Sequence, residues 1–279
     1  MARTYGLIGT RPDLGARLAD AHLAALGSSS LPDSTWGIGY FDQDEALLWR
    51  RRGNAIGLRL TSDAAPMRTH GLLAHECDGS LGPLRTEVTP PLRYGSMLFS
   101  CQGVSDKVEP LVHEARRQLP EYLRSVVRGE TLSELAFALL LSELPTTGLV
   151  LRKPSDRSTL TDPFSNDALA VAMRTTLNRL DKLTNDAGRA DFKGDLWLHT
   201  GEQLIVAHRE GQLGLQVLRG RADLQRWNVS PVDGAAGLDQ ALFVALAAGQ
   251  ELAPTWERLP DHVIITATRG QLPETQALM

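Results

Sequence analysis

The order of strand-like and helix-like segments along the chain is the feature that most limits its fold. Short apolar segments of strand length fill the first hundred residues and the last third of the chain, and the part between them has helical spacing. A doubly wound parallel sheet needs strands and helices in regular alternation, which is missing here. The sequence therefore predicts an α+β fold in which helices cover sheets. No repeat and no long linker divides the chain, so we expect a single domain over residues 1–279.

One predicted strand, residues 36–41, has the sequence Trp-Gly-Ile-Gly-Tyr-Phe. Gly37 and Gly39 carry no side chain, which lets another backbone approach closely. The run Arg50-Arg51-Arg52 is interpreted as a solvated turn before Gly53, with a docking patch as the alternative. The other predicted strands are 5–9, 46–49, 55–60, 70–75, 97–101, 195–199, 203–208, 213–218 and 263–268.

The predicted helices have recognisable starts. Pro12 opens the first at a position where its missing N–H costs nothing. One apolar stripe follows it, made of Leu14, Leu18, Ala21 and Ala25. Thr131 and Glu134 have the spacing of a capping box at the start of another helix. Further helices are predicted over residues 108–126, with a break at Pro120, over 163–185 and over 238–248.

Composition and charge exclude several classes of protein. The 279 residues carry a formal net charge of −4 and no long basic run, so we expect neither a nucleic-acid partner nor a membrane surface. The longest apolar window, residues 135–141, is far below the roughly twenty residues of a membrane-spanning helix. Two cysteines cannot form a disulfide framework, and we expect a cytoplasmic protein.

The common cofactor and catalytic motifs are missing. The sequence contains no phosphate-binding glycine loop, no dinucleotide-binding glycine triplet, no His-Glu-x-x-His and no Gly-x-Ser-x-Gly. The seven histidines are scattered, and none lies three or four residues from another. We therefore expect no cofactor and no metal site. A Cys–His pair that meets only in the folded protein stays open.

Five short segments, taken in their order, resemble one family. They are Met1-Ala2-Arg3 leading into the first strand, Trp36 to Tyr40, Leu72-Leu73-Ala74-His75, Phe99 to Gly103, and Gly129-Glu130-Thr131-Leu132-Ser133-Glu134. In this order they resemble the class II glutamine amidotransferases, which have the N-terminal-nucleophile hydrolase fold. The similarity is greatest to the small stand-alone bacterial proteins and spans almost the whole chain. It implies a four-layer α/β/β/α sandwich of two antiparallel sheets flanked by helices.

The resemblance also implies what a working site would contain. A cysteine at the N-terminus attacks the side-chain amide of glutamine, and its own α-amino group acts as the base. An asparagine side chain and a glycine N–H stabilise the oxyanion. An arginine binds the α-carboxylate of the substrate, and an aspartate binds its α-ammonium group.

Four of these five positions differ in this chain. By resemblance, Ala2 stands at the nucleophile, Cys77 at the arginine, Gln102 at the oxyanion asparagine and Leu132 at the aspartate, whereas Gly103 is retained. An alanine methyl group cannot attack an amide. We therefore expect no catalytic residue, and interpret the chain as an inactive binding or regulatory module for a protein partner or a small ligand. The five positions are expected to converge at one edge between the sheets.

Three alternatives remain open. In the first, the chain is an active amidotransferase or amidohydrolase with an altered nucleophile, and its substrate has no free α-amino and α-carboxyl groups. A shifted register would make Thr4 the nucleophile after removal of three residues, although Arg3 matches the family and argues against the shift. In the third alternative, Cys77 and Cys101 form a redox pair. Whether or not they form a redox pair, we expect at least one of the two cysteines to line the site.

Overall fold

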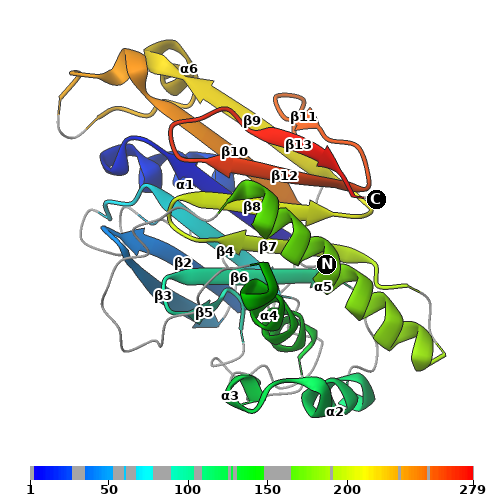
Figure 1. Ribbon diagram of the computed structural model, residues 1–279. Coiled ribbons are helices and arrows are strands. Elements are labelled where there is room, and N and C mark those ends of the chain that lie inside the picture. Colours follow the sequence, from blue (N-terminus) through cyan, green and yellow to red (C-terminus); the bar gives the residue numbers. More distant parts are fainter. Residues whose placement is uncertain are drawn as a thin grey trace.

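Two β-sheets packed face to face form the centre of the computed structural model (Figure 1). The structure describes residues 3–26, 35–52, 60, 67–77, 89–103, 109–124, 127, 131–147, 165–188, 191–231, 234–249 and 252–278. Sheet A has the strand order β11 (Glu257–Arg258), β9 (Leu213–Arg219), β10 (Leu242–Ala248), β1 (Arg3–Gly9), β4 (Gly71–Cys77), β2 (Thr35–Asp42) and β3 (Glu45–Arg52). Sheet B has the order β13 (Glu274–Ala277), β12 (Val263–Thr268), β8 (Gln203–His208), β7 (Gly194–His199), β6 (Met97–Gly103) and β5 (Leu92–Tyr94).

Helices cover the outer faces of both sheets, as Figure 1 shows for α4 and α5 in front of sheet B. The helices on the side of sheet B are α2 (Glu109–Gln118), α3 (Glu121–Arg124), α4 (Leu132–Glu143) and α5 (Asn166–Asp186), with the short η3 (Leu144–Thr147). Those on the side of sheet A are α1 (Pro12–Ala25) and α6 (Gly220–Arg226), with the short η4 (Leu238–Gln240). All described strand pairs are antiparallel. The expected four-layer α/β/β/α sandwich is confirmed.

Three layers of apolar side chains hold the sandwich together, and strand alternation decides which residue joins which layer. In β1, Tyr5 and Leu7 face α1, whereas Ile8 faces sheet B. The layer between the sheets also contains Leu73, Trp197 and others from both sheets. Each central strand is therefore buried on both faces, which explains why its sequence is almost continuously apolar.

The glycines of the Trp-Gly-Ile-Gly segment have the predicted effect. A Cβ atom on Gly37 would overlap the backbone carbonyl oxygen of Pro90, which belongs to the segment leading into sheet B. A Cβ atom on Gly39 would lie 2.7 Å from a methyl carbon of Leu98 on β6. The missing side chains therefore let the two sheets approach each other closely at β2.

The starts of α1 and α4 are also as predicted. Helix α1 begins at Pro12. At α4, the Glu134 N–H donates to Thr131 Oγ1 at 3.2 Å, and the Glu134 carboxylate accepts from Thr131, which completes the capping box. Helix α4 is buried against sheet B on one side and against its neighbouring helices on the other, so its residues are apolar almost all round.

The predicted helix over residues 238–248 is wrong. Only Leu238–Gln240 form a short 3₁₀ turn, and Leu242–Ala248 form β10, between β9 and β1 in sheet A. A short apolar run that is buried on both faces has no periodicity by which a strand differs from a buried helix. The long-range pairing of β10 with β1, and not the local pattern, decides its conformation.

The interpretation of Arg50-Arg51-Arg52 as a turn is also wrong. These residues end β3, where they pair with β2. Arg50 Nε donates to the carbonyl oxygen of Thr89 at 2.9 Å, and Nη2 donates to that of Pro91 at 3.2 Å. Of the predicted strand 55–60, only Leu60 is among the described residues, and the predicted start of the helix at 163–164 lies outside them.

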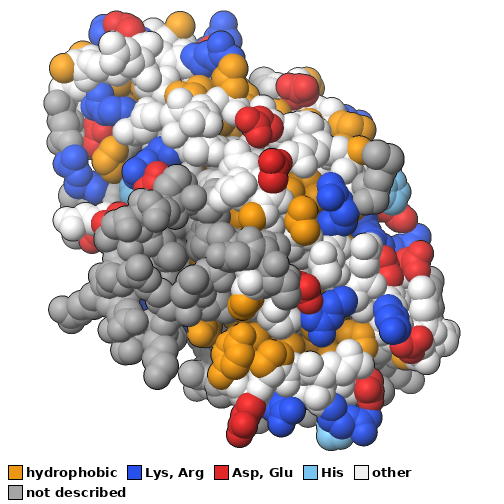
Figure 2. All heavy atoms as spheres, viewed as in Figure 1, with side chains coloured by type: hydrophobic (Ala, Val, Ile, Leu, Met, Phe, Trp, Pro, Cys, Tyr) orange, Lys and Arg blue, Asp and Glu red, His pale blue; other side chains and the backbone are white. Residues whose placement is uncertain are grey.

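None of the described helices is long and apolar enough to cross a membrane. On the face seen in Figure 2, described Lys and Arg side chains alternate with Asp and Glu side chains. That face therefore carries no extended patch of one charge.

Candidate functional site

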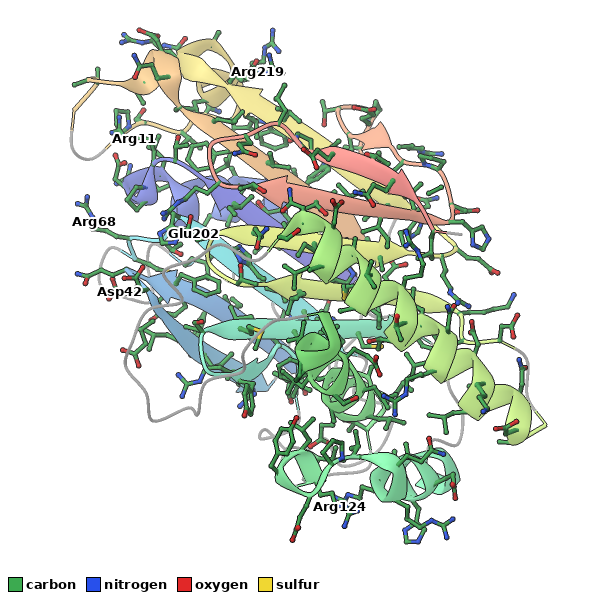
Figure 3. All side chains as sticks on the ribbon, viewed as in Figure 1. Arg11, Asp42, Arg68, Arg124, Glu202 and Arg219 are labelled. Carbon is green, nitrogen blue, oxygen red and sulfur yellow. The ribbon has the colours of Figure 1, made fainter. Side chains whose placement is uncertain are left out.

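The candidate site lies at the end of the sandwich where β1 begins. In sheet A, Thr4 of β1 lies opposite His75 of β4. In sheet B, Gln102 of β6 lies opposite Asp195 of β7. These residues sit on the inward-facing sides of their strands, so the two sheets present polar side chains to each other here. Figure 3 shows the labelled Arg11, Asp42, Arg68 and Glu202 at the opposite end.

Hydrogen bonds join the two sheets at this end. Thr4 Oγ1 donates to Gln102 Oε1 at 3.1 Å and lies 2.9 Å from His75 Nδ1. Ser100 Oγ lies 2.7 Å from the same nitrogen. Thr4, His75 and Ser100 are buried, and Gln102 is half-buried. The hydroxyl, imidazole and amide groups therefore bind one another across the gap between the sheets.

The protonation of His75 follows from these contacts. The Thr4 hydroxyl has one hydrogen and donates it to Gln102, so the proton between Thr4 and His75 belongs to Nδ1. Burial lowers the pKa of His75 from 6.5 to about 4, because a charged imidazolium would lose its hydration. His75 is therefore neutral at pH 7 and donates from Nδ1.

A pair of buried polar residues in sheet B extends this group of hydrogen-bonded side chains. His208 Nδ1 on β8 lies 2.7 Å from Asp195 Oδ1 on β7, and the backbone N–H of Arg209 donates to the same oxygen at 3.3 Å. Burial alone would lower the pKa of His208, but the hydrogen bond and charge of Asp195 outweigh it and raise that pKa. Asp261 Oδ1 lies 3.4 Å from His208 Nε2 on the outer side.

We call the inward-facing group at this end the polar layer. It consists of Thr4, His75, Ser100, Gln102, Asp195 and His208. It closes one end of the apolar layer between the sheets, where Trp197 and Val206 are the next inward-facing residues along β7 and β8. Neutral donors and acceptors make up most of it, and its one described carboxylate is paired with His208.

The outer face of sheet A at the same end is built differently. Arg3 forms an ion pair with Glu76 of β4 through both Nε and Nη2, which contact Oε2. The guanidinium carbon lies 5.4 Å from the centre of a ring of Trp36 on β2, a cation–π distance. Side chains alternate along a strand, so this group and the polar layer lie on opposite faces of β1.

Comparison with known proteins gives matches among solved structures only. No protein-family model and no curated protein sequence matches this chain. A glutamine aminotransferase class-II domain protein from Silicibacter pomeroyi matches with a TM-score of 0.58, 16% identity, and coverage of 99% of this chain and 98% of that one. A predicted glutamine amidotransferase from Pseudomonas aeruginosa matches with a TM-score of 0.54, 15% identity and coverage of 97% of both chains.

A third match is glutamine phosphoribosylpyrophosphate amidotransferase from B. subtilis, with a TM-score of 0.59 and 12% identity. It covers 99% of this chain but 49% of that protein, so this chain spans about half its length. The fold is that of the class II glutamine amidotransferases. At these identities the likeness concerns the fold alone, and the resemblance expected from the five sequence segments is confirmed at that level.

The positions taken from the class II glutamine amidotransferase resemblance can now be placed. Ala2 lies outside the described residues. Gln102 belongs to the polar layer, and Gly103 ends β6 opposite Gly194. Cys77 ends β4 opposite Thr35 of β2, and its side chain is outside the description. Gln102 and Gly103 therefore lie at the expected edge, close to the start of β1.

Leu132 lies on the outer side of sheet B instead of facing the polar layer. It is the first residue of α4, it is 9% exposed, and it belongs to the apolar core between sheet B and its helices. Ser133 Oγ donates to the carbonyl oxygen of Cys101 at 3.2 Å, which fixes the start of α4 beside the end of β6. Leu132 thus fills its position by apolar packing.

Cys101 also faces away from the polar layer. Its side chain packs with Phe99 in the core beneath α4 and α5, and burial raises its pKa well above the usual value for a thiol. Neighbouring residues of a strand point to opposite faces, so Gln102 faces inward and Cys101 faces outward. Cys101 therefore does not line the site, and the expectation that one cysteine does so depends on Cys77.

Sequence reasoning missed Ser100, Asp195, His208 and the Arg3–Glu76 pair. The sequence does contain a pattern that could have indicated the first three. Each is a polar residue on a largely apolar strand, an even number of positions from another residue that faces inward. For Arg3 and Glu76, no spacing in the sequence indicates that β1 and β4 are adjacent.

Proposed function

We propose that this chain is a catalytically inactive protein with the class II glutamine amidotransferase fold, which acts as a binding or regulatory module. The observation that carries the proposal is the burial of Leu132. By resemblance this position holds the carboxylate that binds the α-ammonium group of glutamine, and here an apolar side chain fills it inside the core. A buried leucine offers no partner to a cation.

The polar layer supports the same proposal. The Gln102 side chain, which by resemblance stands at the oxyanion position, accepts the hydroxyl of Thr4. Transition-state stabilisation needs donors aimed at the developing charge, and losing one such donor costs about 3 kcal/mol of barrier. Ala2 provides no nucleophile, and Cys77 no guanidinium. What remains is a fold that offers surfaces and pockets for a protein partner or a small ligand.

One contact favours the alternative of an active amidohydrolase. Thr4 Oγ1 lies 2.9 Å from His75 Nδ1, so a hydroxyl and an imidazole are already adjacent. Such an enzyme needs Thr4 at the N-terminus, where its own α-amino group could act as the base. The ion pair between Arg3 and Glu76 opposes this alternative, because removal of Arg3 would leave a buried carboxylate without its partner.

Intact mass spectrometry separates the two proposals. The full chain is incubated with an electrophilic glutamine analogue, beside an active class II glutamine amidotransferase as positive control, and ammonia release from glutamine is measured in parallel. We expect a mature chain that begins at Met1 or Ala2, no adduct and no ammonia. An adduct at the N-terminus or at Cys77, or a mature chain that begins at Thr4, would overturn the proposal of an inactive protein.

A matched variant sharpens this result. The variant that combines Ala2→Cys, Cys77→Arg, Gln102→Asn and Leu132→Asp carries, at these four positions, the residue types that the reaction needs by resemblance. An adduct in this variant together with none in the wild type would assign the inactivity to these four positions. Thermal unfolding of both proteins shows whether the variant is folded.

A further inference from the structure

Two turns connect the sheets side by side at the end of the sandwich that holds the polar layer. Residues 209–212 lead from β8 of sheet B to β9 of sheet A, and residues 259–262 lead from β11 of sheet A to β12 of sheet B. The turns are neighbours because β8 pairs with β12 and β9 pairs with β11. The backbone N–H of His262 in the second turn donates to the carbonyl oxygen of Arg209 in the first at 3.1 Å. His208, the last residue of β8, immediately precedes the first turn.

The imidazole of His208 lies between two carboxylates. Nδ1 is 2.7 Å from Asp195 Oδ1 within sheet B, and Nε2 is 3.4 Å from Asp261 Oδ1 in the second turn. The Asp195 side chain is 5% exposed, whereas that of Asp261 is 54% exposed. Nε2 is buried and has no hydrogen-bond partner in the described part of the chain, so its contact with Asp261 is that of an ion pair. A neutral imidazole has one N–H, so only the imidazolium can donate to both carboxylates.

The same two carboxylates also bind the backbone of the first turn. Asp195 Oδ1 accepts the N–H of Arg209 at 3.3 Å, and Asp261 Oδ1 accepts the N–H of Gly211 at 3.2 Å. The oxygen of Asp261 that faces His208 is therefore the oxygen that binds Gly211. A movement of the Asp261 carboxylate away from the imidazole would also remove the acceptor of the Gly211 N–H.

The charged side chains that follow in the first turn have partners elsewhere. They form two ion pairs, Arg209 with Asp181 of α5 and Glu210 with Lys193. Val263, which lies opposite His208 on β12, is apolar, and His262 of the second turn is exposed. In the described part of the chain, the charges that act on the His208 imidazole are therefore those of Asp195 and Asp261.

We propose that His208 is a proton-operated latch between the two turns. As an imidazolium it donates from Nδ1 to Asp195 and from Nε2 to Asp261, and the exposed Asp261 side chain closes that second bond by a small rotation. When the Nε2 proton leaves, two acceptors face each other, so Asp261 turns into solvent and gives up the N–H of Gly211. The bond to Asp195 persists in both states because Nδ1 keeps its hydrogen. The latch does not depend on whether the chain is catalytically inactive.

The pH at which the latch opens follows from the same contacts. Burial disfavours the imidazolium, but Asp195 and Asp261 outweigh burial and raise the pKa of His208 above 6.5. Between pH 6.5 and that raised pKa, the folded chain holds a proton that the unfolded chain has released. The contribution of the latch to stability is therefore complete below pH 6.5 and is lost as the pH rises through the pKa of the folded protein.

NMR titration of the ¹⁵N-labelled full chain between pH 5.5 and pH 9 tests the latch. The ring ¹⁵N resonances of His208 distinguish the imidazolium from each neutral tautomer. We expect the imidazolium at the acid end, a midpoint above pH 6.5, and hydrogen retained on Nδ1 at the alkaline end. The backbone amide resonance of Gly211 should shift with the same midpoint. Carboxyl groups ordinarily titrate at about pH 4, so a shift in this range reports the imidazole.

Two variants of exposed carboxylates form a matched pair. Asp261→Asn keeps the shape of the side chain and removes its charge, so we expect the midpoint of His208 to fall by about one pH unit, a tenfold weaker proton affinity. Glu210→Gln removes a charge from the first turn that pairs with Lys193 instead, and it should leave the midpoint unchanged. The wild-type titration stands by itself where a variant does not fold.

The inference is overturned if the midpoint of His208 lies at or below pH 6.5, which is also the result expected if the shared proton stays on Asp195. It is equally overturned if the Gly211 amide does not follow that midpoint, or if Asp261→Asn lowers the midpoint no more than Glu210→Gln does. None of these results changes the adduct and ammonia measurements, so failure of the latch is distinguishable from failure of the proposed inactivity.

Discussion

The hydroxyl of Thr4 donates to the side-chain oxygen of Gln102 at 3.1 Å, and this bond joins β1 of sheet A to β6 of sheet B at one end of the sandwich. The same hydroxyl lies 2.9 Å from His75. One small side chain therefore links a residue of each sheet. Because Thr4, His75 and Ser100 are buried, water does not readily replace a hydrogen-bond partner that is lost here.

The Thr4→Val variant tests that link. Valine has the shape of threonine but no hydroxyl, so Gln102 and His75 both lose a partner in a buried place. We expect a loss of about 1–3 kcal/mol in the free energy of unfolding, measured by urea denaturation. Thr4→Ser keeps the hydroxyl and should lose less. Equal stability of the valine variant and the wild type would contradict a stabilising role of this hydrogen bond.

A pair of glycine variants tests the close approach of the sheets at β2. In Gly37→Ala, the new methyl group overlaps the backbone oxygen of Pro90, which cannot move without displacing its segment. In Gly39→Ala, the new group meets the flexible end of Leu98 at 2.7 Å. Overpacking costs about 1–3 kcal/mol, and we expect Gly37→Ala to be the more destabilised of the two in thermal unfolding. The reverse order would contradict the close approach of Pro90.

Removing one charge of the Arg3–Glu76 pair is expected to destabilise the protein more than removing both. Arg3→Leu leaves the buried carboxylate of Glu76 without its cation, and we expect a loss of about 3–5 kcal/mol in the free energy of unfolding. The double variant Arg3→Leu/Glu76→Leu removes both charges and should recover a large part of that loss. A double-mutant cycle by urea denaturation measures the coupling. Additive losses would show that the two charges do not depend on each other.

Three buried histidines predict acid sensitivity. Burial lowers the pKa of His22 to about 3, of His75 to about 4 and of His199 to about 3. Between these values and 6.5, the unfolded chain binds protons that the folded chain does not, so unfolding becomes more favourable as the pH falls. Each histidine contributes about 1.4 kcal/mol per pH unit in that window.

Urea denaturation between pH 7.5 and pH 5 measures this dependence. We expect stability to decrease steadily below pH 6.5, where the three lowered histidine pKa values outweigh the opposite contribution of His208, whose pKa is raised. The His75→Asn variant has one fewer such group, so its stability should depend less steeply on pH, whatever its stability at pH 7.5. An unchanged slope in that variant would contradict the neutral state of His75.

Local patterns in the sequence predicted much of the backbone. Pro12 places the start of α1, Thr131 and Glu134 cap α4, and Gly37 lies where another backbone approaches. These predictions succeeded because each depends on residues only a few positions apart, or on the absence of a side chain. The prediction for residues 238–248 failed because β10 is specified by pairing with β1 and β9, which are distant in the sequence.

The sequence by itself determined the order of strands and helices, the ordered segments that resemble the class II glutamine amidotransferases, and the substitutions at Ala2, Cys77 and Leu132. Only the tertiary structure decided that Gln102 meets Thr4 and that Leu132 fills the core under α4. It also decided that Trp36 and Glu76 pair across β2 and β4 and that, in the described part of the chain, each has a buried polar atom without a hydrogen-bond partner. The physical reason is register: one residue along a strand reverses the face on which a side chain lies, and strand pairing brings together groups that are far apart along the chain.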